Sequence, residues 1–219
     1  MNEIINNRRD EKLREAEIFT GMTDKEFNAA MKSINVGEKV YDKNEIIFSA
    51  GDITEQTGLI LEGSVMIESS DIWGNNTLLG IMETGKLFAV TYALIGAPLL
   101  VDVRAKERTR ILFLRVNNIN LSASWSFKLL KNLLRITAGK NLHLSERSFI
   151  NANKTIRRKV MSYLNSLSLK TKSRELLIPF DRQQMADYLN VDRSALSKEL
   201  SAMKDEGIID FHKNHFLLI

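Results

Sequence analysis

Residues 181–207 restrict the fold more than any other stretch, because they predict two short helices joined by a tight connection. Asp181 can cap the first helix, and Gln184 three residues later completes a capping-box pattern. Asp192 can cap the second helix, and Gly207 can adopt the left-handed conformation that ends it. The stretch therefore predicts a helix-turn-helix.

The two faces of the second predicted helix differ in chemistry. One face is apolar at helical spacing and should pack inward: Leu196, Leu200 and Met203. The other is polar and should face outward: Arg193, Ser194, Ser197, Lys198 and Ser201. An Arg in the first turn can donate two hydrogen bonds to guanine O6 and N7, and Lys198 can reach a base or a phosphate. The alternative is an ordinary solvated helix, since these residue types are common on exposed faces.

The chain after these helices favours the first interpretation. Residues 208–211 and 215–219 are apolar-rich runs around a turn at Lys213 and Asn214, which predicts a β-hairpin. A helix-turn-helix followed by a hairpin is a winged helix. Residues 151–219 also contain 12 Lys or Arg and 8 Asp or Glu, whereas residues 1–150 contain 19 of each. The excess positive charge thus lies in the part predicted to approach a polyanion.

Absent residues and motifs exclude several classes of site. The chain has no cysteine, so we expect no disulfide, thiolate nucleophile, or Cys-held zinc or iron–sulfur cluster. We find no phosphate-binding Gly loop, no paired-His zinc motif and no Ser/His/Asp set, and we expect no enzymatic activity, metal or cofactor. No apolar run could span a membrane and no signal segment is present, so we expect a cytoplasmic protein.

The chain before residue 117 predicts short strands after a polar helical segment. Residues 3–31 are helical in pattern, and Thr23 with Glu26 forms a capping box. Short β-prone runs separated by Gly, Asn and Asp then follow, and they are residues 45–48, 57–61, 64–67, 77–81, 100–105 and 110–114. Their spacing predicts an antiparallel barrel or roll of the jelly-roll type.

Helical periodicity replaces this pattern at residues 117–149. Leu129, Leu133 and Ile136 recur at steps of three and four residues. A helix this apolar needs a partner, which is either its own barrel or a twin helix in a dimer. We expect an α+β chain with a β-roll at residues 1–116, a long dimerisation helix at residues 117–150 and a winged helix at residues 151–219.

Two stretches resemble the signatures of the Crp/Fnr family of bacterial transcription regulators. They are residues 51–65, GDITEQTGLILEGSV, and residues 182–194, RQQMADYLNVDRS. The resemblance covers nearly the whole chain and implies a cyclic-nucleotide-binding-type β-roll, a dimer helix and a winged helix. It also implies a homodimer that binds an inverted-repeat operator in double-stranded DNA.

The resemblance assigns individual residues as well. It places Arg193, Ser194 and Lys198 at base-reading positions, and Arg182 and Gln183 where the family touches the DNA backbone. We add Ser197 to this DNA-binding set, because it lies on the same outward stripe. By resemblance alone, RNA polymerase is a further partner, with residues 168–174 as its candidate surface.

The effector site departs from the family pattern. In members that bind cyclic AMP, a Glu holds the ribose and an Arg–Ser pair holds the phosphate. Here those positions fall at Val90 and at Leu99 and Leu100, and Arg104 is the nearest cation. Burying a phosphate without a cation is strongly penalised, so the sequence argues against cyclic AMP.

We expect instead an apolar small-molecule effector of unknown identity. Its candidate pocket is lined by Phe88, Val90, Tyr92, Leu99 and Leu100. The alternative is that these side chains fill the pocket themselves. A second function also stays open, in which the chain is a ligand-sensing or protein-interaction module whose winged helix contacts protein rather than DNA.

Overall fold

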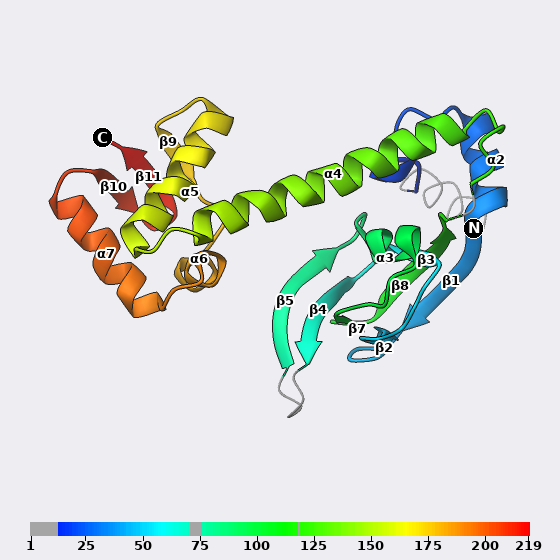
Figure 1. Cartoon of the computed structure of the whole chain (residues 1–219), viewed down its shortest axis with the longest axis horizontal. Coiled ribbons are helices and arrows are strands. Elements are labelled where there is room, and N and C mark those ends of the chain that lie inside the picture. The colour runs from blue at the N-terminus through cyan, green and yellow to red at the C-terminus, as the bar shows by residue number, and fades with distance from the viewer. Residues whose placement is uncertain (1–12, 71–75, 118) are drawn as a thin grey trace, which may run out of the picture. The chain divides into compact units, whose positions relative to one another are not determined.

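The computed structural model describes residues 13–70, 76–117 and 119–219, and Figure 1 shows its helices and strands. The chain divides into two compact units within a long helix, at Ala138 and Gly139. We call the part up to Ala138 unit 1 and the part from Gly139 unit 2. The boundary predicted from the sequence, between residues 150 and 151, lies at the end of this helix instead. No described helix is both long and apolar enough to span a membrane.

The described part of unit 1 contains two antiparallel sheets of four strands each, and Figure 1 labels these strands except β6. The first has the order β1 (Asn35–Tyr41), β8 (Thr109–Arg115), β3 (Gln56–Glu62) and β6 (Leu87–Phe88). The second has the order β2 (Ile46–Phe48), β7 (Asp102–Ala105), β4 (Ser64–Ser70) and β5 (Asn76–Glu83). The predicted antiparallel roll is confirmed, whereas β1, β6 and the short helix α3 (Val90–Ile95) were not predicted.

Strand β8 is buried on both faces, which explains its continuous apolar run. Ile111 and Phe113 face a core shared by the two sheets. Leu112 and Leu114 face a second core, formed with the N-terminal helices and the start of the long helix. Successive side chains of a strand point to opposite faces, so this one strand joins both cores of unit 1.

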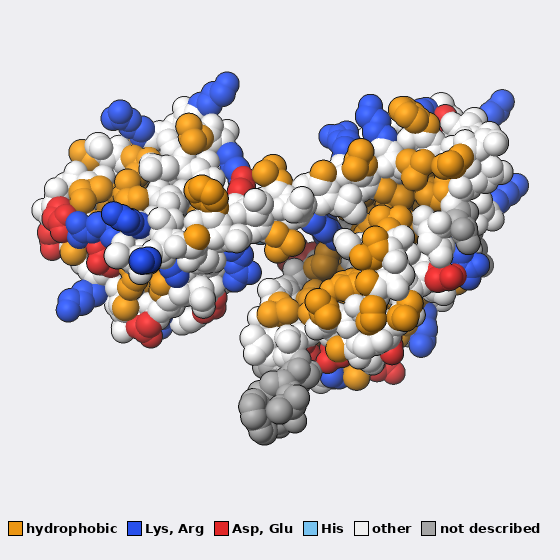
Figure 2. Space-filling model, in the orientation of Figure 1, with side chains coloured by type: hydrophobic (Ala, Val, Ile, Leu, Met, Phe, Trp, Pro, Cys, Tyr) orange, Lys and Arg blue, Asp and Glu red, His pale blue; other side chains and the backbone are white. Residues whose placement is uncertain are grey.

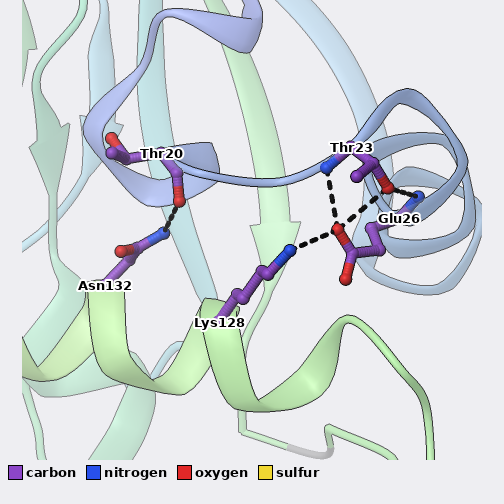
Figure 3. A network of polar contacts seen from close by, with 5 residues as sticks. All are labelled: Thr20, Thr23, Glu26, Lys128 and Asn132. Carbon is purple, nitrogen blue, oxygen red and sulfur yellow. Dashed lines mark hydrogen bonds and ion pairs between the residues drawn. The ribbon is translucent and has the colours of Figure 1, made fainter.

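Between residue 13 and the first strand, the structure describes a 3₁₀ turn, η1 (Glu17–Phe19), and a helix, α2 (Asp24–Ile34). The predicted capping box at Thr23 and Glu26 is confirmed. The Glu26 carboxylate also binds the Lys128 ammonium at 2.7 Å, and the Asn132 side-chain amide donates to the Thr20 carbonyl at 2.9 Å. Figure 3 shows both contacts. These contacts fasten the long helix to the N-terminal segment.

The long helix, α4 (Ser126–Asn151), begins later than the predicted residue 117. The preceding segment forms turns instead, in which the Asn120 carboxamide oxygen accepts a hydrogen bond from the Ser122 amide at 3.0 Å. Asn and Ser favour such turns because their side chains bond to nearby backbone groups. The Ser126 hydroxyl then donates to the carbonyls of Leu121 and Ala123.

The candidate dimer residues on α4 lie against their own domain. Leu129 and Leu133 are 0% and 2% exposed in the second core of unit 1, and Ile136 packs beside them. The opposite face of the same helix is solvent-exposed and apolar, with Phe127 at 75% and Leu134 at 68%. Figure 2 shows hydrophobic side chains reaching the surface along α4. A partner helix would therefore meet this second face rather than the buried one.

Unit 2 continues through a helix, α5 (Ile156–Thr171), and ends in the predicted winged helix. The helices are α6 (Arg182–Leu189) and α7 (Arg193–Asp205), and the hairpin is β10 (Ile209–His212) and β11 (His215–Leu218). A further strand, β9 (Glu175–Leu177), pairs with β11 and completes a three-stranded antiparallel sheet. Only this third strand was not predicted in the winged helix.

Candidate nucleic-acid interface

Three polar residues identified in the sequence cap the N-terminal ends of the two helices of the helix-turn-helix. The Asp181 carboxylate accepts from the Gln184 amide at 2.8 Å, and the Gln184 side chain accepts in return from the Asp181 amide at 2.9 Å. Asp192 accepts from the Ala195 amide at 2.9 Å and caps α7. The pKa of Asp192 lies below its ordinary value, chiefly because the Ser194 hydroxyl donates to it. Asp192 is therefore ionised while it caps the helix.

The orientation of α7 follows from its apolar face. Leu196, Leu200 and Met203 are all 0% exposed, and they share one core with Met185 and Leu189 of α6. Burial of these side chains stabilises the pairing of the two helices. The opposite face of α7 is thereby presented to solvent, as predicted.

The exposed stripe of α7 leaves two cationic side chains available. The serine hydroxyls bond within the segment: Ser194 to Asp192, Ser197 to the Arg193 carbonyl and Ser201 to the Ser197 carbonyl. Arg193 and Lys198 are exposed, and within the described structure neither side chain bonds to another residue. These two are therefore the free donors of the stripe.

Two acidic side chains, Glu199 of α7 and its C-cap residue Glu206, are paired with Arg157 of α5. Its guanidinium bonds to Glu199 at 2.6 Å and to both oxygens of Glu206 at 2.7 Å. The pKa of Glu206 is lowered, chiefly because the Arg157 guanidinium donates hydrogen bonds to its carboxylate. This role of Arg157 was not predicted from the sequence, because Arg157 lies 42 residues before Glu199 and no local pattern joins them.

Arg182 takes part in the packing of the wing. Its guanidinium carbon lies 5.2 Å from the ring centre of Phe211 and 5.7 Å from that of Phe216. It also donates to the Lys213 carbonyl at 3.4 Å, and burial lowers its pKa. Its neighbour Gln183 donates to Asp187 at 2.8 Å. The aromatic contacts could not be read from the sequence, while the backbone-contact role of both residues stays a prediction.

The candidate effector residues do not share one environment. Phe88 and Leu99 are 2% exposed in the core between the sheets, with Tyr92 packed against it. Val90 belongs to the other core of unit 1, and Leu100 is 77% exposed. The structure therefore places three of the five beside one another and separates the remaining two.

The core between the sheets is occupied by aromatic rings. The ring centres of Phe48 and Phe88 are 5.8 Å apart, and those of Phe48 and Phe113 are 5.9 Å apart. Phe88 packs directly on Gly58, where a Cβ atom would lie 2.1 Å from the ring. These contacts agree with the alternative in which side chains fill the interior of the roll.

Arg104 is directed away from this core. Its neighbours Val103 and Ala105 are buried inward on β7, so the alternation of the strand places Arg104 on the outer face. There it bonds to Glu68 at 3.2 Å and to the Asn44 carbonyl at 2.7 Å. Arg104, the cation nearest to Leu99 and Leu100 in the sequence, therefore already has partners on the outer face of the roll.

Models of known protein families match a part of each unit. The family model of the cyclic nucleotide-binding domain matches residues 38–120, and that of the Crp-like helix-turn-helix domain matches residues 158–219. No curated protein matches the chain by sequence.

Solved structures share the fold at low sequence identity. The catabolite activator protein of Thermus thermophilus is 21% identical over 93% of each chain, with a TM-score of 0.51. The c-di-GMP-responsive regulator CLP of Xanthomonas campestris is 16% identical over 89% of this chain and 96% of its own, with a TM-score of 0.51. The OCPA-complexed CprK is 15% identical over 88% of each chain, with a TM-score of 0.60.

The order of the two matched domains and the shared fold agree with the signatures at residues 51–65 and 182–194. The chain belongs to the Crp/Fnr family of transcription regulators.

Proposed function

We propose that the chain is a homodimeric transcription regulator that reads a DNA sequence through Arg193 and Lys198 of α7. The observation that carries the proposal is the exposed stripe of α7, in which these two cations have free donors while the serines bond locally. Arg in the first turn of a recognition helix suits guanine, and a single ammonium suits a base or a phosphate. Arg157 holds the carboxylates of Glu199 and of the C-cap residue Glu206 in ion pairs, which limits their repulsion of the polyanion.

The exposed apolar face of α4 supports the dimer. Phe127, Leu130 and Leu134 follow each other at helical spacing, opposite the buried Leu129 and Leu133. A twin helix would remove this surface from water, and two-fold symmetry would place two copies of α7 at half-sites about one helical turn apart.

We further propose that cyclic nucleotides do not control this protein. The ribose position is Val90 and the phosphate positions are Leu99 and Leu100, none of which carries a charge. Val90 and Leu99 are buried among apolar side chains, Leu100 is exposed, and Arg104 is paired with Glu68. Related structures are described with chemically different ligands, c-di-GMP for CLP and OCPA for CprK, so the shared fold does not determine the ligand. If an effector binds, its site is apolar and its entry requires Phe88 or Tyr92 to move.

A melting experiment tests this part of the proposal. The melting temperature is measured with cyclic AMP and, separately, with an apolar metabolite extract. We expect no shift with cyclic AMP. A rise in melting temperature with cyclic AMP would contradict the proposal, and the absence of a shift with the extract would favour a roll filled by its own side chains.

RNA polymerase remains a proposed partner at residues 168–174. This segment ends α5 and is closed by a hydrogen bond of 2.6 Å from the Ser168 hydroxyl to the Ser173 carbonyl.

Substitution of two arginines tests the DNA-reading assignment. Arg193→Ala should reduce the preference for the operator over a shuffled duplex by ~1–3 kcal/mol, because it removes a base contact. Arg182→Ala should weaken the operator and the shuffled duplex alike, because it removes a backbone contact and loosens the wing. Binding is measured by fluorescence anisotropy on a duplex selected from a random pool. Equal losses on both duplexes for Arg193→Ala would show that Arg193 does not read bases.

A further inference from the structure

The C-terminal end of α6 is bound by side chains from two other helices of unit 2. The last carbonyls of an α-helix lack partners within the helix and carry the negative end of its dipole. Here the carbonyls of Asp187, Tyr188, Leu189 and Asn190 all accept hydrogen bonds from side chains. The helix-turn-helix connection lies immediately after these groups.

Lys159 of α5 makes the shortest of these contacts. Its ammonium donates to the Leu189 carbonyl at 3.0 Å and to the Asn190 carbonyl at 3.2 Å. Asn190 is the left-handed residue of the turn, with φ of 50°. The next amide, that of Val191, returns to the Ala186 carbonyl at 3.0 Å. One ammonium thus holds both residues at which the chain leaves α6 for α7.

Two residues of α4 support the same end. Arg147 donates to the Asp187 and Tyr188 carbonyls at 3.4 Å, and its guanidinium lies 5.6 Å from the Tyr188 ring centre. Asn151, one turn later on α4, donates to the Tyr188 carbonyl at 3.3 Å. These contacts are longer than those of Lys159, so we assign them a supporting role.

We propose that Lys159 is a positioning residue for α7, which fixes the helix-turn-helix connection and thereby the angle at which the recognition helix is presented. Arg147 and Asn151 connect the same turn to the end of α4. The DNA-binding test of this inference rests on the proposed function, whereas the hydrogen-exchange test does not. A basic side chain in such a domain would ordinarily be assigned to a phosphate, but two donors of Lys159 point to backbone carbonyls instead.

The neighbouring residue supplies a matched control. Arg158 is exposed on the same helix, and its replacement by Met removes one positive charge, as replacement of Lys159 by Met does. The experiment compares Lys159→Met, Arg158→Met and the conservative Lys159→Arg, whose guanidinium can still donate to carbonyls. Circular dichroism first establishes that each variant remains folded.

Hydrogen exchange measures the positioning role without DNA. Lys159→Met should accelerate exchange at the amides of Asn190 and Val191, because the turn opens more often when its carbonyls lose their donor. Arg158→Met should leave both amides unchanged, and Lys159→Arg should restore most of their protection. Unchanged exchange in Lys159→Met would overturn the proposal.

DNA binding gives the second readout. Lys159→Met should lower the ratio of operator affinity to shuffled-duplex affinity about tenfold, because misplaced base contacts affect only the operator. Arg158→Met should leave that ratio unchanged. Equal losses on both duplexes in Lys159→Met, with the ratio preserved, would mean that Lys159 is a phosphate contact and would overturn the proposal. If wild-type protein shows no preference for any duplex, the proposed function fails, and the exchange result alone decides the role of Lys159.

Discussion

Lys128 fixes the start of α4 to α2 through a single carboxylate. The pKa of Glu26 is lowered from its ordinary value of 4.5 to about 2, chiefly because Lys128 donates to it, with help from Thr23. Since the folded pKa lies below the unfolded one, the ionised carboxylate stabilises unit 1 above about pH 4.5. That contribution is lost as the pH falls toward 2.

Replacement of the lysine tests this contact. Lys128→Met should raise the pKa of Glu26 toward 4.5, and it should make stability less dependent on pH between about 4.5 and 2. The pKa is measured by NMR titration of the Glu26 side chain, and stability by urea unfolding across that range. An unchanged Glu26 titration in the variant would show that the ion pair does not form in solution.

Gly58 and Phe88 offer a residue-scale test of the filled roll. Because a Cβ atom at Gly58 would lie 2.1 Å from the Phe88 ring, Gly58→Ala should destabilise the protein by about 1–3 kcal/mol. Gly80→Ala is the matched control, since nothing lies within 4 Å of its added Cβ. Both are measured by denaturant unfolding. Equal effects of the two substitutions would mean that the ring does not occupy this position.

Single residues were predictable where their partners are close in the sequence. The capping side chains of Thr23, Asp181 and Asp192 each bond to the residue three positions later, and the structure confirms all three caps. The contacts of Lys159 with the α6 carbonyls, 30 and 31 residues away, leave no such pattern and became visible only in three dimensions.

At the scale of elements, the exposed apolar face of α4 predicts where two copies of the chain meet. Leu134→Glu should convert the proposed dimer to a monomer while unit 1 stays folded, because the side chain lies on the exposed apolar face. Leu121→Glu is the matched control, since Leu121 is 72% exposed, close to the 68% of Leu134, but precedes α4. Analytical ultracentrifugation measures the mass of each variant. A Leu134→Glu protein that remains a dimer would exclude this face as the interface.

Elements were predictable in proportion to their apolar periodicity. The helices of the winged helix have one buried and one exposed face, so their spacing identified them and their inner residues. Helix α4 is apolar on two faces, and spacing alone could not show that Leu129 and Leu133 belong to the domain's own core. Strand β1 was missed because it is exposed at all but two of its positions, and β6 because it has only two residues.

At the scale of the whole molecule, positive charge predicts how binding responds to salt. The excess of Lys and Arg lies in residues 151–219, so phosphate contacts should supply much of the affinity. We expect DNA affinity to fall at least about tenfold between roughly 50 and 200 mM salt. Titrations at several salt concentrations measure the slope. A salt-insensitive interaction would favour the alternative in which the winged helix binds a protein.

We infer that two copies of α7 read DNA together, and selection of bound duplexes from a random pool would reveal this in the enriched sequence. We predict enrichment of an inverted repeat whose half-sites are centred about one helical turn apart, because a two-fold dimer presents Arg193 to successive major grooves. Enrichment of a single half-site, or of no sequence at all, would contradict the claim.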